Sequence, residues 1–125
     1  MGTGESCTST GEGECLTIRE VMKRAYDTAE KNGFHYQESD GILEYYKSAK
    51  LCLMHSEITE ALEAVRKPEV ADKHLPFDDP VGVELADVMI RLLDFCVEFK
   101  IPIVEIIDRK LIYNETRPYK HGKKF

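Results

Sequence analysis

Two pairs of acidic residues at three-residue spacing are the part of the sequence best suited to chemistry. The first pair is Glu57 and Glu60, and the second is Glu84 and Asp87. An ionised carboxylate is strongly disfavoured in an apolar setting, and carboxylates that converge repel one another. A divalent cation removes this penalty because its charge holds the carboxylates ionised. Since all the ligands are oxygens, the four residues predict a site for Mg²⁺, with Mn²⁺ as a substitute.

Helical geometry places these acids unusually for charged residues. At about 100° per residue, Glu57 falls between Leu53 and Ala61 inside an apolar stripe, and Glu60 falls at the edge of that stripe. The second pair repeats the arrangement, with Glu84 on an apolar face and Asp87 beside it. The repetition favours an inward-facing acidic cluster.

A plainer interpretation stays open beside the metal site. Acids at three-residue spacing are common on solvated helix faces, and Asp87 could pair with Arg91 at i,i+4. A di-iron carboxylate site is excluded, since such bundles need a Glu-x-x-His pair that the chain lacks.

Basic and polar residues gather near the C-terminus. Lys110, Asn114 and Arg117 share a helix face with isoleucines, and the tail adds Lys120, His121, Lys123 and Lys124. These cations could complement a helix dipole or belong to a frayed end. Alternatively, they could bind a polyphosphate whose other side is held by the metal.

Four helices are expected to position these groups. Thr17 and Glu20 form a capping-box signature, and the Asp78-Asp79-Pro80 sequence is a strong helix start. No segment shows strand alternation, so the predicted fold is all-α, of the four-helix bundle type. Residues 1–16 are predicted to be a disordered leader before a domain at 17–125. The expected helices span about 17–32, 41–66, 80–100 and 102–116.

Composition limits the possible partners. The chain has 125 residues, of which 42% are hydrophobic, as expected for one domain. Its net charge of −6 argues against nucleic-acid binding, and it has neither a membrane-spanning apolar run nor a signal peptide. A cytoplasmic location is therefore expected, with the cysteines as free thiols, and Cys52 and Cys96 are predicted to be buried.

The order of these motifs resembles a known family. The segments at 55–64, 84–88 and 114–124, with Lys110 before the last, are similar to the MazG-like branch of the all-α nucleoside triphosphate pyrophosphohydrolases. The resemblance covers roughly residues 17–125. One departure is Ser56, where several relatives have glycine.

The resemblance implies a reaction and a set of roles. Family members hydrolyse a nucleoside triphosphate between the α- and β-phosphates, releasing a monophosphate and pyrophosphate. They usually form homodimers or homotetramers. The two acidic pairs would hold Mg²⁺, and Glu57 or Glu60 would also serve as the catalytic base. The implied substrate-binding residues are Lys110, Asn114, Arg117, Tyr119, His121, Lys123 and Lys124.

The sequence also suggests a substrate class and an alternative function. The substrate is expected to be a deoxynucleotide such as dCTP or dUTP, in nucleotide-pool housekeeping. His35, Tyr36, Tyr45 and Tyr46 are candidates for contacting the base. The alternative function is a non-catalytic helical module that binds nucleotide or a protein partner. Phosphoribosyl-ATP hydrolysis is disfavoured because the residues within the motifs are closer to those of the MazG-like branch.

Overall fold

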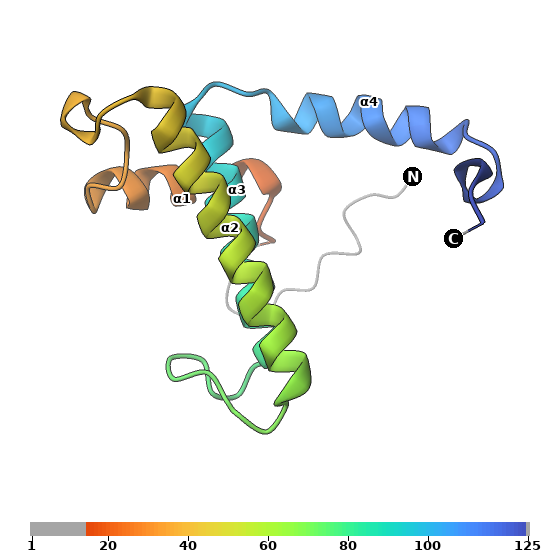
Figure 1. Ribbon diagram of the computed structural model, residues 1–125, viewed down its shortest axis with the longest axis horizontal. Helices are drawn as coiled ribbons and strands as arrows, with labels where there is room; N and C mark the ends of the chain where they lie inside the picture. Colours follow the sequence, from red (N-terminus) through yellow and green to blue (C-terminus); the bar gives the residue numbers. More distant parts are fainter. Residues whose placement is uncertain (1–14, 125) are drawn as a thin grey trace.

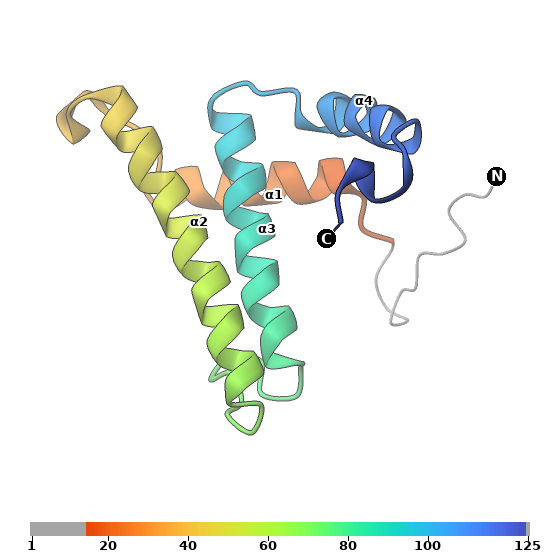
Figure 2. The same cartoon turned by 45° about the vertical axis from the view of Figure 1, so that its right-hand side comes forward.

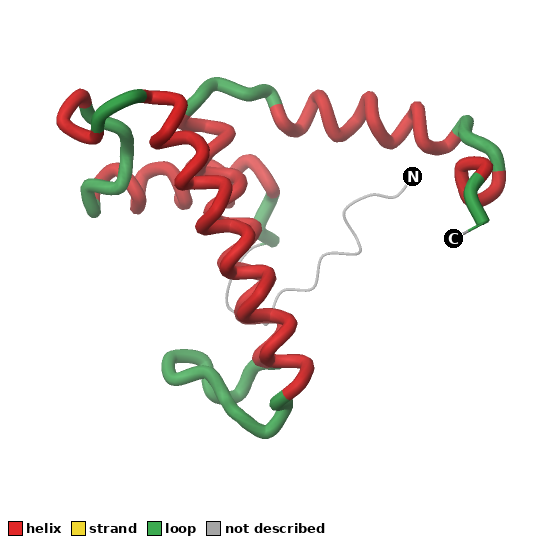
Figure 3. Tube along the Cα trace, viewed as in Figure 1, coloured by secondary structure: helices red, strands yellow, loops and turns green. Residues whose placement is uncertain are grey.

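The computed structural model describes residues 15–124, which contain four α-helices and no strand (Figures 1 and 3). Most of the predicted leader, residues 1–14, lies outside the described part. The all-α prediction is therefore confirmed for the described residues. The elements are α1 (Ile18–Lys31), η2 (Glu38–Asp40), α2 (Leu43–Arg66), α3 (Pro80–Glu98), α4 (Ile103–Glu115) and η3 (Tyr119–Gly122).

Side-chain caps begin α1 and α3 where the sequence predicted them. The Thr17 hydroxyl accepts the Glu20 N–H at 3.1 Å, and the Glu20 carboxylate accepts the Thr17 N–H at 2.8 Å. At α3, the Asp79 carboxylate accepts the Val81 N–H at 2.9 Å, with Pro80 as the first helical residue. These bonds satisfy amide groups that a helix start leaves without partners.

Two helix boundaries differ from the prediction because of backbone conformation. Helix α2 begins at Leu43 and not at Gly41, since Gly41 has a φ of 92° and cannot be helical. Helix α3 ends at Glu98, two residues early, because Lys100 adopts a φ of 58°. The third helix is therefore slightly shorter than expected, and the acidic pairs keep their predicted positions on helices.

Helices α2 and α3 run antiparallel, and α1 crosses α3 (Figure 2). The core lies where these three helices meet, and only a few hydrophobic side chains are buried there. The buried hydrophobic residues are Ala25, Met54, Ala61, Leu93 and Cys96.

Helix α4 extends away from the other three helices (Figures 1 and 2). A 2.8 Å ion pair between Arg19 and Glu105 links its first turn to α1. None of its residues is buried, and Ile107, Leu111 and Ile112 are exposed. A closed four-helix bundle and an oligomer stay predictions.

The cysteines differ in part from expectation. Cys96 is buried as predicted, whereas Cys52 is exposed on α2. Cys15 is disulfide-bonded, so the prediction of free thiols throughout is wrong, because residue spacing alone could not show the pairing.

No described helix is both long and apolar enough to cross a bilayer.

Candidate functional site

Helices α2 and α3 bring acidic side chains together at their interface. Ligand oxygens of Glu57, Glu60 and Glu84 all lie within 4.8 Å of one another. Glu57 is buried, with 8% of its surface exposed, whereas Glu84 is half-buried and Glu60 is exposed. Three of the four predicted metal ligands therefore converge, from both motifs. We call Glu57, Glu60 and Glu84 the acidic cluster.

The carboxylates in and beside this cluster disfavour one another's charge. Burial, followed by the charges of Glu60, Asp87 and Glu57, raises the pKa of Glu84. Burial and then Glu57 also raise the pKa of Asp87, although Arg91 opposes this. Asp87 is exposed and lies outside the tight group, but it is close enough to feel Glu57. A cation at this point would relieve the repulsion.

Arg91 provides partial compensation for the most buried acid. Its Nε donates a hydrogen bond to Glu57 Oε1 at 2.8 Å, across the interface between α3 and α2. The sequence suggested that Arg91 could pair with Asp87 along one helix, but its ion pair is with Glu57. This bond uses one of the two carboxylate oxygens of Glu57.

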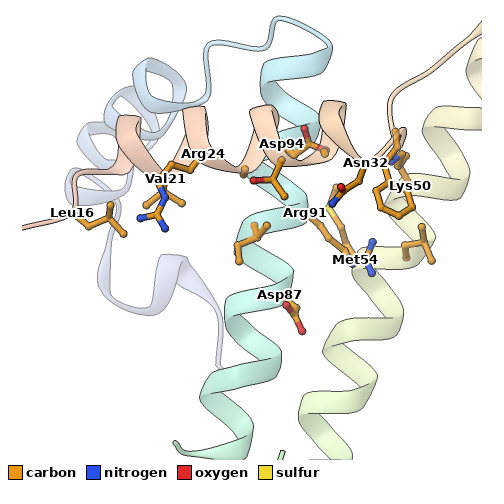
Figure 4. A pocket seen from close by; sticks show the side chains of 15 residues that line it. Leu16, Val21, Arg24, Asn32, Lys50, Met54, Asp87, Arg91 and Asp94 are labelled. Atoms are coloured by element: carbon orange, nitrogen blue, oxygen red, sulfur yellow. The ribbon is translucent and has the colours of Figure 1, made fainter. Parts of the chain in front are cut away.

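A cavity of about 670 Å³ lies beside the acidic cluster, between α1, α2 and α3 (Figure 4). Asp87 and Arg91 belong to its wall, and Arg91 bonds to Glu57, so the cavity adjoins the acidic cluster. Arg24 lines it from α1, Asn32 from the position directly after α1, and Lys50 and Met54 from α2. Sequence analysis missed this cavity because it depends on how three separate helices cross.

The residues that connect α1 to α2 form a hydrogen-bonded network, which we call the connector network. His35 Nε2 lies 2.7 Å from Asp94 Oδ1, and the Glu98 carboxylate accepts the Tyr36 N–H at 2.6 Å. The Tyr46 hydroxyl and the Lys50 ammonium each donate to the Phe34 carbonyl at 2.7 Å. These bonds hold the connector against α2 and α3.

This network engages three of the four residues predicted to contact a base. His35 and Tyr46 belong to it, and the Tyr36 hydroxyl donates to the Gly41 carbonyl at 2.6 Å. Burial and Glu98 raise the pKa of Tyr46, so its hydroxyl remains a donor. Tyr45, the fourth, is 72% exposed.

A second group of possible metal ligands lies within the connector network. His35, Asp94 and Glu98 have ligand atoms within 4.8 Å of one another, but their hydrogen bonds give them a structural role.

The predicted phosphate-binding residues lie elsewhere in the chain. Lys110 and Asn114 are exposed on α4, which leaves from the end of α3 opposite the loop that joins α2 to α3 (Figure 1). The Lys110 ammonium and the Arg117 guanidinium lie 5.4 and 5.5 Å from the centre of the Tyr113 ring. Tyr113 is thus a neighbour that sequence analysis missed. Tyr119, Lys123 and Lys124 are exposed, and the His121 side chain lies outside the described part.

Comparison of the chain with known protein families, curated proteins and solved structures gives no match.

Proposed function

We propose that the protein is an Mg²⁺-dependent nucleoside triphosphate pyrophosphohydrolase. The observation that carries this proposal is the convergence of the Glu57, Glu60 and Glu84 oxygens within 4.8 Å, on two helices, with Asp87 one turn further along. The donor set is made of hard oxygens, and the shared repulsion of these groups is what a divalent cation relieves. The residues present therefore fit Mg²⁺, with Mn²⁺ as a substitute.

The chain's own residues divide the remaining work. Bound Mg²⁺ would offset phosphate charge and polarise the α-phosphorus. Glu60 is exposed and Glu57 has one oxygen not engaged by Arg91, so either carboxylate can accept the proton of an attacking water. A new bond forms between the water oxygen and the α-phosphorus. The bond between the α-phosphorus and the oxygen that bridges to the β-phosphate breaks. Nucleoside monophosphate and pyrophosphate leave as products.

A partner subunit completes the site in this proposal. Lys110 and Asn114 are carried away from the acidic cluster of their own chain by α4, whose apolar residues are exposed. A homodimer or homotetramer would bury those residues and bring the partner's α4 to the phosphates. Arg117, Tyr119, His121, Lys123 and Lys124 would follow α4 into the same region. The oligomer thus supplies positive charge for the leaving pyrophosphate.

A substrate panel tests the activity directly. The full chain is incubated with Mg²⁺ and each ribo- and deoxynucleoside triphosphate, and the products are separated by chromatography. We expect pyrophosphate and a monophosphate, with dCTP or dUTP among the best substrates, consistent with cytoplasmic nucleotide housekeeping. Release of orthophosphate alone would overturn the proposal.

A second function is favoured by one observation. The Arg91–Glu57 ion pair shows that the most buried acid already has a counter-charge from the protein. A helical module that binds nucleotide or a protein partner without catalysis would need no metal ion to balance the charge of Glu57. In that case, Mg²⁺ would change neither the melting temperature nor the affinity for nucleotides.

A further inference from the structure

We infer that the cavity between α1, α2 and α3 binds the base and sugar of the nucleotide, with the Asn32 amide contacting the base edge. This inference rests on the proposed function. It replaces the aromatic residues that the sequence suggested for base contact, three of which are hydrogen-bonded within the fold. It also names the part of the chain that would select one nucleotide over another.

The size and walls of the cavity suit a flat ring. A volume of about 670 Å³ lies within the range of roughly 300–1,000 Å³ typical of small-molecule sites. The wall includes Ala25 and Ala29 on α1, Met54 on α2 and Ile90 on α3. Two alanines leave room between the helices, and the larger side chains provide apolar contact.

The position of the cavity ties its ligand to the acidic cluster. Asp87 and Arg91 line the cavity, and Arg91 also bonds to Glu57. A molecule with phosphates at the acidic cluster therefore extends into the cavity with its other end. A nucleoside triphosphate has that shape, and its polar sugar and base suit a wall that includes Arg24, Asp87 and Asn32.

We assign the base contact to Asn32 because it is the one carboxamide among the residues that line the cavity, whereas Arg24 and Asp87 in the same wall carry charge. Lys50, Arg91 and Asp94 are bonded to Phe34, Glu57 and His35, respectively. The Asn32 backbone N–H ends α1 by bonding to the Thr28 carbonyl at 3.0 Å, while its side chain is exposed at the cavity (Figure 4). A carboxamide offers a donor and an acceptor side by side, as base edges do.

Phe34 adds a surface for stacking. Its ring is 61% exposed and lines the cavity, and its carbonyl is fixed by Tyr46 and Lys50. An exposed aromatic ring on a fixed backbone can stack on any of the bases, because each base has a π-face. Base selectivity therefore falls to Asn32.

Two variants and one control test the inference. Ala29→Leu fills the cavity, Asn32→Leu removes the amide at similar size, and Ala49→Leu is the matched control on an exposed part of α2. We expect Ala29→Leu to raise the KM for deoxynucleoside triphosphates about tenfold or more, with Mg²⁺-tripolyphosphate binding unchanged since that probe lacks a base. Asn32→Leu should reduce the ratio of kcat/KM between the best and worst nucleotide by about tenfold.

The outcomes separate this inference from the proposed function. If wild type releases pyrophosphate but neither variant alters KM or base preference, the cavity inference is overturned and the function stands. Equal loss of tripolyphosphate and nucleotide binding in Ala29→Leu also overturns the inference, and so does a second copy of the chain found to fill the cavity. If wild type hydrolyses no nucleotide, the cavity inference is tested separately by measuring the binding of deoxynucleoside monophosphates by equilibrium dialysis in EDTA. Binding that Ala29→Leu abolishes and Ala49→Leu retains supports the cavity, and absence of wild-type binding overturns it.

Discussion

The ion pair between Glu57 and Arg91 supplies a counter-charge to the most buried acid of the cluster. The Glu57 side chain is only 11% exposed, and its 2.8 Å bond to Arg91 satisfies a charge that would otherwise be costly to bury. The Arg91 side chain is 43% exposed, so solvent screens part of the attraction. Truncating Arg91 therefore leaves Glu57 without its counter-charge.

Arg91→Met should destabilise the metal-free protein. We expect the free energy of unfolding, measured by urea denaturation, to fall by about 1–2 kcal/mol because Glu57 stays buried without a partner. Mg²⁺ should recover more stability in the variant than in wild type, since the cation then supplies the missing charge. An unchanged free energy of unfolding would contradict the role assigned to this pair.

Glu84→Gln separates metal ligation from folding. The neutral amide cannot replace a carboxylate ligand, so we expect Mg²⁺-dependent hydrolysis to fall by about 100-fold or more. The metal-free melting temperature should stay equal or rise, because a mutually repelling charge is removed. Glu63→Gln, at an exposed residue that pairs with Arg66 at 3.4 Å, is the matched control and should keep full activity. A large fall in melting temperature without loss of activity would favour a structural role for Glu84.

The same variant gives a pH dependence with a definite sign. Because the folded-state pKa of Glu84 is raised above its ordinary value of 4.5, folding favours the protonated carboxyl. The stability that this group contributes is present below pH 4.5 and is lost as pH rises through the raised pKa. The stability of Glu84→Gln relative to wild type, without metal, should therefore increase from about pH 4 to pH 7. Thermal melts of both proteins across that range, in EDTA, test it, and a constant difference would refute it.

At the scale of elements, the connector network fixes how α1 meets α2. Tyr46 donates to the Phe34 carbonyl at 2.7 Å and also lies 3.3 Å from a Glu98 oxygen. Its ring makes edge contacts with Tyr36 and Phe99, at centroid distances of 5.1 and 6.1 Å. One side chain of α2 thereby ties the connector to α3. The cavity depends on this attachment because Phe34 is part of its wall.

Tyr46→Phe should loosen the connector while keeping the ring contacts. Loss of the hydroxyl leaves the Phe34 carbonyl with one donor fewer, so we expect the free energy of unfolding to fall by about 1 kcal/mol. Hydrogen exchange at the connector amides should accelerate. Tyr45→Phe is the control, since Tyr45 is exposed, and should change neither quantity. Equal effects of the two substitutions would mean that the hydroxyl bonds do not hold the connector.

At the scale of the whole molecule, one chain leaves much apolar surface unpacked. Ile107, Leu111, Ile112 and Tyr113 on α4 are exposed, and so are Leu51, Leu53 and Ile58 on α2. Monomeric proteins rarely expose large contiguous apolar patches, and such surfaces usually mark interfaces. In the oligomer that we propose, a partner chain would cover the apolar residues of α4 and bring its own Lys110 to the acidic cluster.

Mixing two inactive variants tests whether the site is shared between chains. Glu84→Gln retains Lys110, and Lys110→Ala retains the acidic cluster, so a hybrid oligomer of the two has one site with both parts intact. After denaturation and joint refolding, we expect hydrolysis to return to about a quarter of wild type, since about half of randomly formed dimers are hybrids. Each variant refolded alone is the control. No recovery in oligomers shown to be hybrid by mass spectrometry, or a stable monomer in light scattering, would contradict a shared site.

The sequence by itself determined the helices and the acidic motifs. The Thr17 capping box, the Asp79–Pro80 start and the place of Glu57 in an apolar stripe all depend on local bonding and helical periodicity, which neighbouring residues fix. The meeting of Glu57 with Glu84 was inferred from two stripes, since each helix must bury its apolar face. Capping and periodicity both act within a few residues of the chain, so they can be read from the sequence alone.

Only the tertiary structure decided which partners the residues found. Arg91 bonds to Glu57 and not to Asp87, Cys52 is exposed, and a cavity opens beside Asp87, because these outcomes depend on how α1, α2 and α3 cross. Contacts between helices join residues far apart in the chain, and helical periodicity carries no information about crossing angle or register. The placement of α4 away from the acidic cluster follows from the same cause.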